Sequence, residues 1–287
     1  MLSIFFYVNK NIKNVNESID FLSSKINNDV NLYVFFDDCD VVSNIDSNKC
    51  TIIKTNQTMG PSYFYNSYLN EIKTKYVWFI DGSCTFSNEL NDIFSLLGNV
   101  NNDYLSFGSM EKTIINQNNF DKFNENIMPL IQNIFFSTFF LNTNSIRFTN
   151  NFFSLLFIYK VISRSNNGMI LNKTIIKMNK NRGKIFDYNE IMSNINDFFI
   201  NYSQSNFWNN NKKFNEAMVI YFLIYIYLFD VYNSPSNRFI KNIYLLAVKN
   251  FLNKNMDDWT DNDTYGKLFK KIELKDECIF QLINEWK

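Results

Sequence analysis

The sequence contains no histidine, and this absence excludes more chemistry than any other feature of its composition. Without an imidazole, the chain has no Ser–His or Cys–His nucleophile pair, no histidine general base and no histidine metal ligand. The four cysteines, Cys39, Cys50, Cys84 and Cys278, lack Cys-x-x-Cys spacing, which is typical of a reduced cytoplasmic protein rather than a zinc site or a disulfide framework. Acid–base chemistry must therefore use carboxylates, lysine, tyrosine, cysteine or water.

Net charge and long apolar runs are also missing. Lys+Arg and Asp+Glu each number 28, so no basic field is present to attract nucleic acid. The apolar start, Met1–Tyr7, is too short for a secretory signal, and the longest apolar run, Ala217–Phe229, falls short of the roughly 20 residues of a membrane span. We therefore expect a cytoplasmic protein that does not bind nucleic acid.

Glycine and proline are scarce, with 7 and 3 residues, whereas phenylalanine and tyrosine are abundant, with 31 and 16. Hydrophobic residues make up 46% of the chain, which is enough for a sizeable core and argues against disorder. A length of 287 residues suits one large domain or a domain with an appendage.

The first hundred residues alternate short apolar runs with helical patterns. Strands are expected at Leu2–Val8, Asn31–Phe36, Thr51–Lys54 and Tyr76–Ile80, and helices at Asn16–Ile26 and Ser62–Ile72. Strands rich in β-branched and aromatic residues, separated by helices, are typical of a mostly parallel sheet that helices cover on both faces. The expected fold class is therefore α/β, with a mostly parallel sheet flanked by helices.

Polar residues follow each of these four strands. The clusters are Asn9-Lys10, Asp37–Asp40, Thr55–Gln57 and Asp81–Ser83. Because the carboxyl ends of parallel strands meet at one edge, where such sheets bind ligands, we expect one binding crevice there. The same residue types also cap helices and form turns, but four clusters in this order favour a binding edge.

The rest of the chain is less regular and then helical. A strand is expected at Tyr104–Phe107 and another at Lys173–Met178, with a helix inside Phe120–Phe136 and one at Phe152–Ile162. A C-terminal helical segment is expected to contain helices at Asn189–Tyr202, Asn215–Tyr232, Pro235–Phe251 and Leu268–Trp286. Ala217–Phe229 is apolar around its whole circumference, so we expect core burial, with a homodimer contact or a membrane contact as alternatives.

The order of the motifs resembles that of family 2 glycosyltransferases, which have the GT-A fold. The second strand ends in Phe36-Asp37-Asp38, and the fourth in Phe79-Ile80-Asp81-Gly82-Ser83, where the family has Asp-x-Asp. Between them, Asn56-Gln57-Thr58-Met59-Gly60-Pro61-Ser62-Tyr63-Phe64-Tyr65-Asn66 is similar to the family's Asn-x-Gly segment, with one extra residue before the glycine and Tyr65 where arginine is usual. The resemblance covers residues 1 to about 90.

The resemblance implies a transferase that moves a sugar from a nucleotide-diphospho-sugar, UDP-linked, to a saccharide or lipid-linked acceptor. It implies inversion and a role in the synthesis of surface polysaccharide or another glycan. Residues 1–98 would form the nucleotide-sugar-binding half, residues 99–200 the acceptor-side half and residues 201–287 the helical segment. The implied nucleotide-binding residues are Tyr7, Asn9, Asp37, Asp38, Asn56, Gly60, Asn66, Asp81, Gly82 and Ser83.

In this family-based assignment, Asp38 or its neighbour Asp37 accepts a hydrogen bond from the nucleobase. Asp81 holds the ribose or a Mn²⁺ or Mg²⁺ ion. Ser83 departs from the family by replacing the second aspartate, and one carboxylate holds a hard cation weakly. We therefore expect the cation to arrive with the nucleotide.

Charge on the diphosphate would then be balanced by Lys177, Lys180 and Arg182, which also fit a solvated basic loop. The family's acidic pair is replaced by Phe153-Ser154, so Glu111, with Asp103 as the alternative, is the candidate base, although both are also typical surface carboxylates. These departures leave a second hypothesis open, a catalytically degenerate domain that binds a nucleotide-sugar or a partner chain. A nucleotidyltransferase is disfavoured, because the glycine-rich loop of that class is absent after the first strand.

Overall fold

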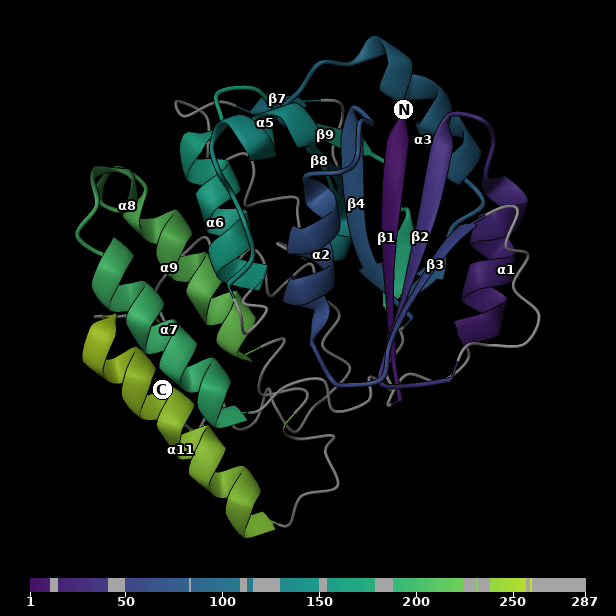
Figure 1. Cartoon of the computed structure of the whole chain (residues 1–287). Helices are drawn as coiled ribbons and strands as arrows, with labels where there is room; N and C mark the ends of the chain where they lie inside the picture. Colours follow the sequence, from purple (N-terminus) through teal and green to yellow (C-terminus); the bar gives the residue numbers. More distant parts are fainter. Residues whose placement is uncertain are drawn as a thin grey trace. The chain divides into compact units, whose positions relative to one another are not determined.

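The computed structural model describes residues 1–10, 15–40, 50–82, 84–108, 113–115, 130–149, 154–178, 188–224, 231, 238–256 and 259. The chain divides into two compact units, one of Met1–Asn118 with Ile127–Gly183 and one of Asn119–Asn126 with Lys184–Lys287. In the described residues, the first unit holds the β-sheet and the second is helical (Figure 1).

An eight-stranded sheet with the strand order β3-β2-β1-β4-β8-β6-β9-β7 forms the first unit. Its strands are β1 Leu2–Asn9, β2 Val30–Asp37, β3 Cys50–Thr55, β4 Tyr76–Asp81, β6 Tyr104–Gly108, β7 Thr113–Ile115, β8 Ile134–Ser137 and β9 Gly168–Asn172. The strands β3, β2, β1 and β4 are parallel neighbours, and β6 is parallel to β9. Because β8 and β7 alone are antiparallel to their neighbours, the sheet is mostly parallel, as the sequence predicted.

One face of the sheet packs against two helices, α1 Val15–Lys25 and α3 Leu90–Leu96. Alternate residues of β1, Leu2, Ile4, Phe6 and Val8, join these helices in a single buried cluster. Side chains of a strand alternate between the two faces of the sheet. A strand that is buried on both faces therefore has a nearly continuous apolar sequence. This burial explains the sequence of β1, LSIFFYVN.

The other face carries an aromatic core below α2 Pro61–Leu69 and α6 Ser154–Arg164 (Figure 1). Tyr65 of α2 lies 4.9 Å from Phe79 of β4, and Phe157 of α6 stacks on Phe148 at 4.0 Å, measured between ring centroids. Phe79 also meets both Phe148 and Phe157 edge-on. Aromatic pairs in these geometries stabilise a core beyond their buried area, so the abundant phenylalanine has a structural role here.

The structure confirms the strands and helices predicted as far as residue 80, with ends that differ by at most three residues. A helix was expected inside Phe120–Phe136, but Ile134–Ser137 forms the strand β8, and residues 116–129 lie outside the described part. The strands β5, β7 and β9 and the helices α3 and α5 (Thr138–Thr143) were not predicted. Strand β5, Cys84–Phe86, pairs with β10, Ile176–Met178, in a separate two-stranded sheet.

The second unit contains α7 Tyr188–Tyr202, α8 Asn206–Asn210, α9 Lys212–Tyr221 and α11 Arg238–Asn255. These helices confirm the predicted C-terminal helical segment, and the expected helix at Leu268–Trp286 lies outside the described residues. Phe199 of α7 packs edge-on against Phe251 of α11, with ring centroids 5.8 Å apart.

The described part of the apolar run 217–229 is buried, as expected. Its side chains Ala217, Met218, Val219, Ile220, Phe222, Leu223 and Ile224 are all 5% exposed or less. These positions therefore offer no surface to a second subunit or a membrane. Within the described residues, no helix has both the length and the hydropathy needed to cross a bilayer.

Substituting Gly168 with alanine should destabilise the fold, because Gly168 lies directly opposite Tyr104 in the sheet. A Cβ atom at this position would lie 2.1 Å from Cζ of Tyr104, whose ring is buried. We expect Gly168→Ala to lower the free energy of unfolding by about 1–3 kcal/mol, measured by urea denaturation. The control is Gly98→Ala, whose Cβ would meet only the flexible side chain of Met1, at 3.3 Å. Equal stability of the two variants would contradict the clash.

Candidate functional site

The carboxyl ends of four parallel strands meet at one edge of the sheet. In the strand register, Asn9 lies opposite Asp37, Asp37 lies opposite Thr55, and Tyr7 lies opposite Asp81. The polar clusters predicted from the sequence are therefore neighbours in space. This edge is where open α/β sheets bind their ligands.

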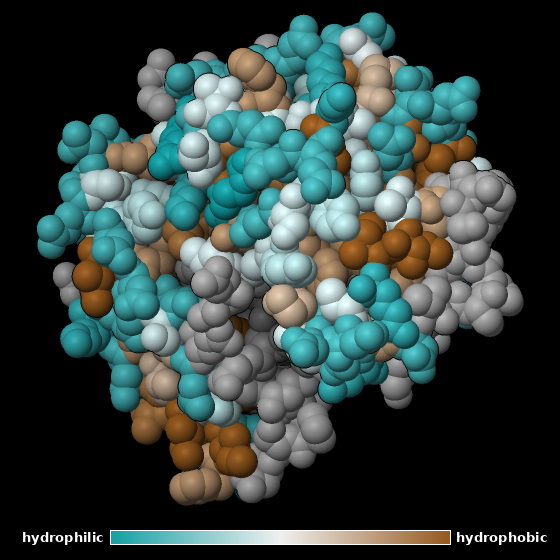
Figure 2. All heavy atoms as spheres, viewed as in Figure 1, coloured by the Kyte–Doolittle hydropathy of each residue, from teal (hydrophilic) through white to brown (hydrophobic). Residues whose placement is uncertain are grey.

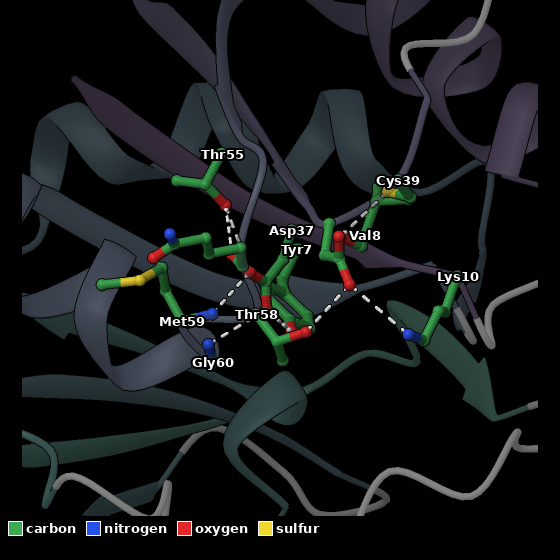
Figure 3. A network of polar contacts seen from close by, with 11 residues as sticks. Tyr7, Val8, Lys10, Asp37, Cys39, Thr55, Thr58, Met59 and Gly60 are labelled. Atoms are coloured by element: carbon green, nitrogen blue, oxygen red, sulfur yellow. Dashed lines mark hydrogen bonds and ion pairs between the residues drawn. The ribbon is translucent and has the colours of Figure 1, made fainter.

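Asp37 is buried, with 1% of its surface exposed, and it is the centre of a hydrogen-bond network (Figure 3). Its Oδ2 accepts hydrogen bonds from the Tyr7 hydroxyl at 2.5 Å and from the Gly60 N–H at 3.0 Å. Its Oδ1 accepts from the Met59 N–H at 2.8 Å, and the Thr55 hydroxyl lies 3.2 Å away. A buried carboxylate with several donors is stable because these bonds replace its hydration.

The two N–H groups bound by Asp37 belong to the loop that leads into α2. Gly60 has a φ of +78°, which is strained for any residue with a Cβ, and Pro61 follows at the first position of the helix. Asp37 therefore holds the Asn-x-Gly segment in place and fixes the start of α2. Its oxygens are committed to this structural role.

Tyr7 is also part of the protein framework. Burial, followed by the hydrogen bond to Asp37, raises the pKa of the Tyr7 phenol above its usual range, so the phenol stays protonated and donates. The backbone carbonyl of Tyr7 accepts a hydrogen bond from the Gly82 N–H at 3.2 Å. Tyr7 thus joins the Asp37 network to the segment that follows β4.

Asp38 differs from Asp37 in both exposure and backbone. Its side chain is 37% exposed, and its φ of +51° lies in the left-handed region, which aspartate tolerates better than most residues. Its Oδ2 accepts from the Thr58 hydroxyl at 3.0 Å and from Lys10 Nζ at 3.4 Å. Of the two neighbouring aspartates, Asp38 is the one whose carboxylate is accessible to a ligand.

Asp81 ends β4 and lies beside Gln132, in the short helix Ile131–Asn133. The Gln132 amide donates to Asp81 Oδ2 at 3.3 Å, and the Gln132 backbone carbonyl accepts from the Trp78 indole N–H at 2.7 Å. The Cys84 thiol lies 4.0 Å from Asp81 Oδ1. Burial, followed by the negative charge of Asp81, raises the pKa of the Tyr65 phenol well above its usual value.

The described surroundings of Asp81 bear on the cation that the sequence resemblance implies. A hard divalent cation needs several oxygen ligands, but one oxygen of Asp81 faces an amide donor instead of a second carboxylate. Among the described residues, no three histidine, cysteine, aspartate or glutamate side chains come together. Ser83, at the second position of the Asp-x-Asp motif, lies outside this part of the chain.

Asn66 and Asn56 were also predicted to bind nucleotide, but neither side chain belongs to the Asp37 network. The Asn66 amide forms two hydrogen bonds with the backbone of Phe148, donating to its carbonyl and accepting from its N–H, both at 3.0 Å. This pairing ties α2 to a segment 82 residues away, so the Asn66 side chain faces protein backbone. Asn56 is exposed in the loop after β3.

Asp103, the alternative candidate base, is not brought to this edge. It precedes the first residue of β6, which runs parallel to β4, so it lies at the amino end of the strands. Its Oδ2 accepts from the Ser165 hydroxyl at 2.9 Å and from the N–H groups of Asn166 and Asn167 at 3.2 Å. In this position the carboxylate stabilises the turn before β9.

Several predicted residues lie outside the described part of the chain, namely Glu111, Lys180 and Arg182 as well as Ser83. The backbone of Lys177 lies on β10, opposite Thr85 of β5. Because β10 ends with Met178 opposite Cys84, the chain leaves this strand close to the end of β4. The start of the predicted basic stretch is therefore near Asp81.

Three contacts were missed by the sequence analysis. Gln132 contacts Asp81 from 51 positions away, and no local pattern indicates this contact. Thr58 and Lys10 contact Asp38. Lys10 belongs to the polar cluster after β1, and Thr58 directly follows the cluster Thr55–Gln57, so both had a signal in the sequence.

No family model and no curated protein matches the chain. Among solved structures, residues 1–349 of S. aureus TarS align with 94% of this chain and 90% of that one, at 14% identity and a TM-score of 0.58. The same region of TarS in complex with UDP-GlcNAc aligns at 13% identity with a TM-score of 0.59, and its complex with UDP at 14% and 0.55. The chain therefore has the α/β fold of the GT-A type that TarS has.

Proposed function

We propose that the chain is a glycosyltransferase that takes a sugar from a UDP-linked donor and transfers it to a saccharide or lipid-linked acceptor. One observation supports this most directly, namely that Asp38 and Asp81 lie at the same carboxyl edge of a GT-A sheet. TarS, a glycosyltransferase of the same fold, has been crystallised with UDP-GlcNAc and with UDP. Surface polysaccharide or another glycan is the proposed product class.

In the proposed complex, the nucleobase lies against Asp38 and the ribose against Asp81. The exposed Asp38 carboxylate accepts a hydrogen bond from the imide N–H of uracil, while Asp37 holds the loop beside it. The diphosphate then extends past the end of β4 toward the basic stretch that begins at Lys177. Ammonium and guanidinium groups would stabilise the charge of the departing diphosphate.

In the proposed reaction, the acceptor hydroxyl oxygen attacks the anomeric carbon, and the bond from that carbon to the diphosphate oxygen breaks. UDP leaves with the bonding electron pair, and the hydroxyl proton passes to a base. Attack from the side opposite UDP inverts the anomeric configuration. Glu111 is the proposed base, since Asp103 lies at the other edge of the sheet. Any Mn²⁺ or Mg²⁺ is proposed to enter with the nucleotide.

A specific observation favours a second candidate, a domain that binds the nucleotide-sugar without transferring it. Over the described residues, Asp81 has an amide neighbour where a second carboxylate would be needed for a preformed cation site. The helix α6 begins with Ser154, where the family has an acidic residue. Binding of UDP-GlcNAc with neither transfer nor slow hydrolysis would favour this second function over the first.

Substituting Asp38 with alanine tests the proposed base contact. We expect Asp38→Ala to weaken UDP binding about ten- to a hundredfold, because a hydrogen bond to a charged group contributes about 1.5–3 kcal/mol. Isothermal titration calorimetry with UDP and UDP-GlcNAc measures this loss. The matched control is Asp40→Ala in the same segment, since the Asp40 carboxylate is fully exposed and pairs with Lys54. Unchanged affinity in Asp38→Ala would reject the assignment of the base to Asp38.

A further inference from the structure

One face of α11 has large apolar side chains that are exposed to solvent. Phe239, Ile243 and Leu246 are 73%, 50% and 58% exposed. Their spacing of four and three residues places them on one stripe along the helix. Figure 2 shows this hydrophobic surface over the N-terminal half of α11. We call these three side chains the α11 stripe.

The α11 stripe is not needed to hold the helix in its unit. Val248, Phe251 and Leu252 lie on the opposite face and are buried, and Phe251 packs against Phe199 of α7. The helix is therefore anchored by one apolar face while a second apolar face is exposed. An exposed apolar surface of this kind marks an interaction site, because water covers it at a cost in free energy.

The charges of α11 indicate the chemistry of the partner. All charged side chains of the helix are basic, namely Arg238, Lys241, Lys249 and Lys254. The helix itself therefore contains positive charge and no carboxylate, while the chain as a whole has no net charge. Two copies of α11 facing each other would bring like charges together, which argues against a second copy as the partner. An apolar stripe flanked by lysine and arginine fits the interface of an anionic lipid bilayer.

We propose that α11 binds to the surface of anionic membranes. The α11 stripe enters the boundary between headgroups and acyl chains, and the basic side chains bind lipid phosphates. The helix lies along the surface and does not cross it. This inference goes beyond the proposed function and does not depend on it, since membrane binding can be measured without donor or acceptor.

The test is co-sedimentation of the full chain with lipid vesicles. Wild-type protein should bind vesicles that contain phosphatidylglycerol more tightly than vesicles of phosphatidylcholine alone, and less tightly as salt is added. The triple variant Phe239→Asn, Ile243→Asn, Leu246→Asn should bind anionic vesicles about tenfold more weakly or worse. Its thermal unfolding should match wild type, because the three side chains are exposed. The matched control is Phe139→Asn, which removes an even more exposed side chain, at 79%, from α5 and should change nothing.

A second variant, Arg238→Gln with Lys249→Gln and Lys254→Gln, separates charge from hydrophobicity. It should lose the preference for anionic vesicles and keep the weak binding to neutral ones. Three outcomes would overturn the proposal. The first is an absence of binding to anionic vesicles, and the second is full binding by the triple variant. The third is a dimer in sedimentation velocity that the triple variant abolishes while lipid binding is absent.

Discussion

Asp37→Ala is expected to lower the free energy of unfolding by about 3 kcal/mol or more, the largest effect of any single substitution considered for this chain. The substitution leaves the Tyr7 hydroxyl and the N–H groups of Met59 and Gly60 without the acceptor they share. The Tyr7 hydroxyl is buried, whereas the two N–H groups are partly buried. A buried donor without a partner costs about 1–3 kcal/mol, and the cost rises when the lost acceptor is charged. Urea denaturation, followed by circular dichroism, measures the change.

Two comparisons make this result specific to the network. Tyr7→Phe removes a single hydrogen bond to this carboxylate and should cost less than Asp37→Ala, about 1.5–3 kcal/mol. Asp40→Ala removes an exposed carboxylate from the same segment and should stay within about 0.5 kcal/mol of wild type. If Asp37→Ala unfolds at the same urea concentration as Asp40→Ala, then the network does not stabilise the α2 loop and our interpretation is wrong.

Gln132→Glu is expected to create or strengthen a cation site beside Asp81. The substitution places a second carboxylate about 3 Å from Asp81, where two negative charges repel unless a proton or a cation lies between them. Without metal, the variant should therefore be less stable than wild type. Manganese at about ten times its dissociation constant should restore about 1.4 kcal/mol of stability to the variant.

Thermal unfolding with and without manganese, in the absence of nucleotide, measures this gain. Wild-type protein and Gln132→Ala should show no shift, because each has a single carboxylate at this position. The sequence resemblance predicts that Ser83→Asp would produce a similar gain. A wild-type protein that binds manganese tightly without nucleotide would show that other residues complete the site.

Three of the four strands that build the site were predictable because most of their residues are buried. The sequences of β1, β2 and β4 are nearly continuous apolar runs, and a polar cluster marks the end of each one. Strands β5 and β7 were not predictable in this way, because three residues are too few to show a pattern. Strand β8 was missed because its residues, IFFS, continue an apolar stretch that is equally consistent with a helix.

The roles of Asp37 and Asp38 could not be separated by sequence alone. The pair follows an apolar run, and the structure distinguishes its members by backbone and exposure, since the strand continues through buried Asp37 and turns into the left-handed region at Asp38. Asp103 shows a different limitation. It was the alternative candidate base, but a residue before a parallel strand lies at the edge of the sheet opposite to a residue after it. The direction of parallel strands therefore places Asp103, before β6, and Asp81, at the end of β4, at opposite edges of the sheet.

The division of roles between Asp37 and Asp38 has a consequence for evolution in proteins of this fold. Asp37 holds the α2 loop whether or not a ligand is present, so selection for folding alone is enough to retain it. Asp38 is exposed, so it is retained only where selection acts on what it binds. Among relatives of this chain, an aspartate at the first position with free variation at the second would mark lineages that kept the fold without the nucleotide contact proposed for Asp38.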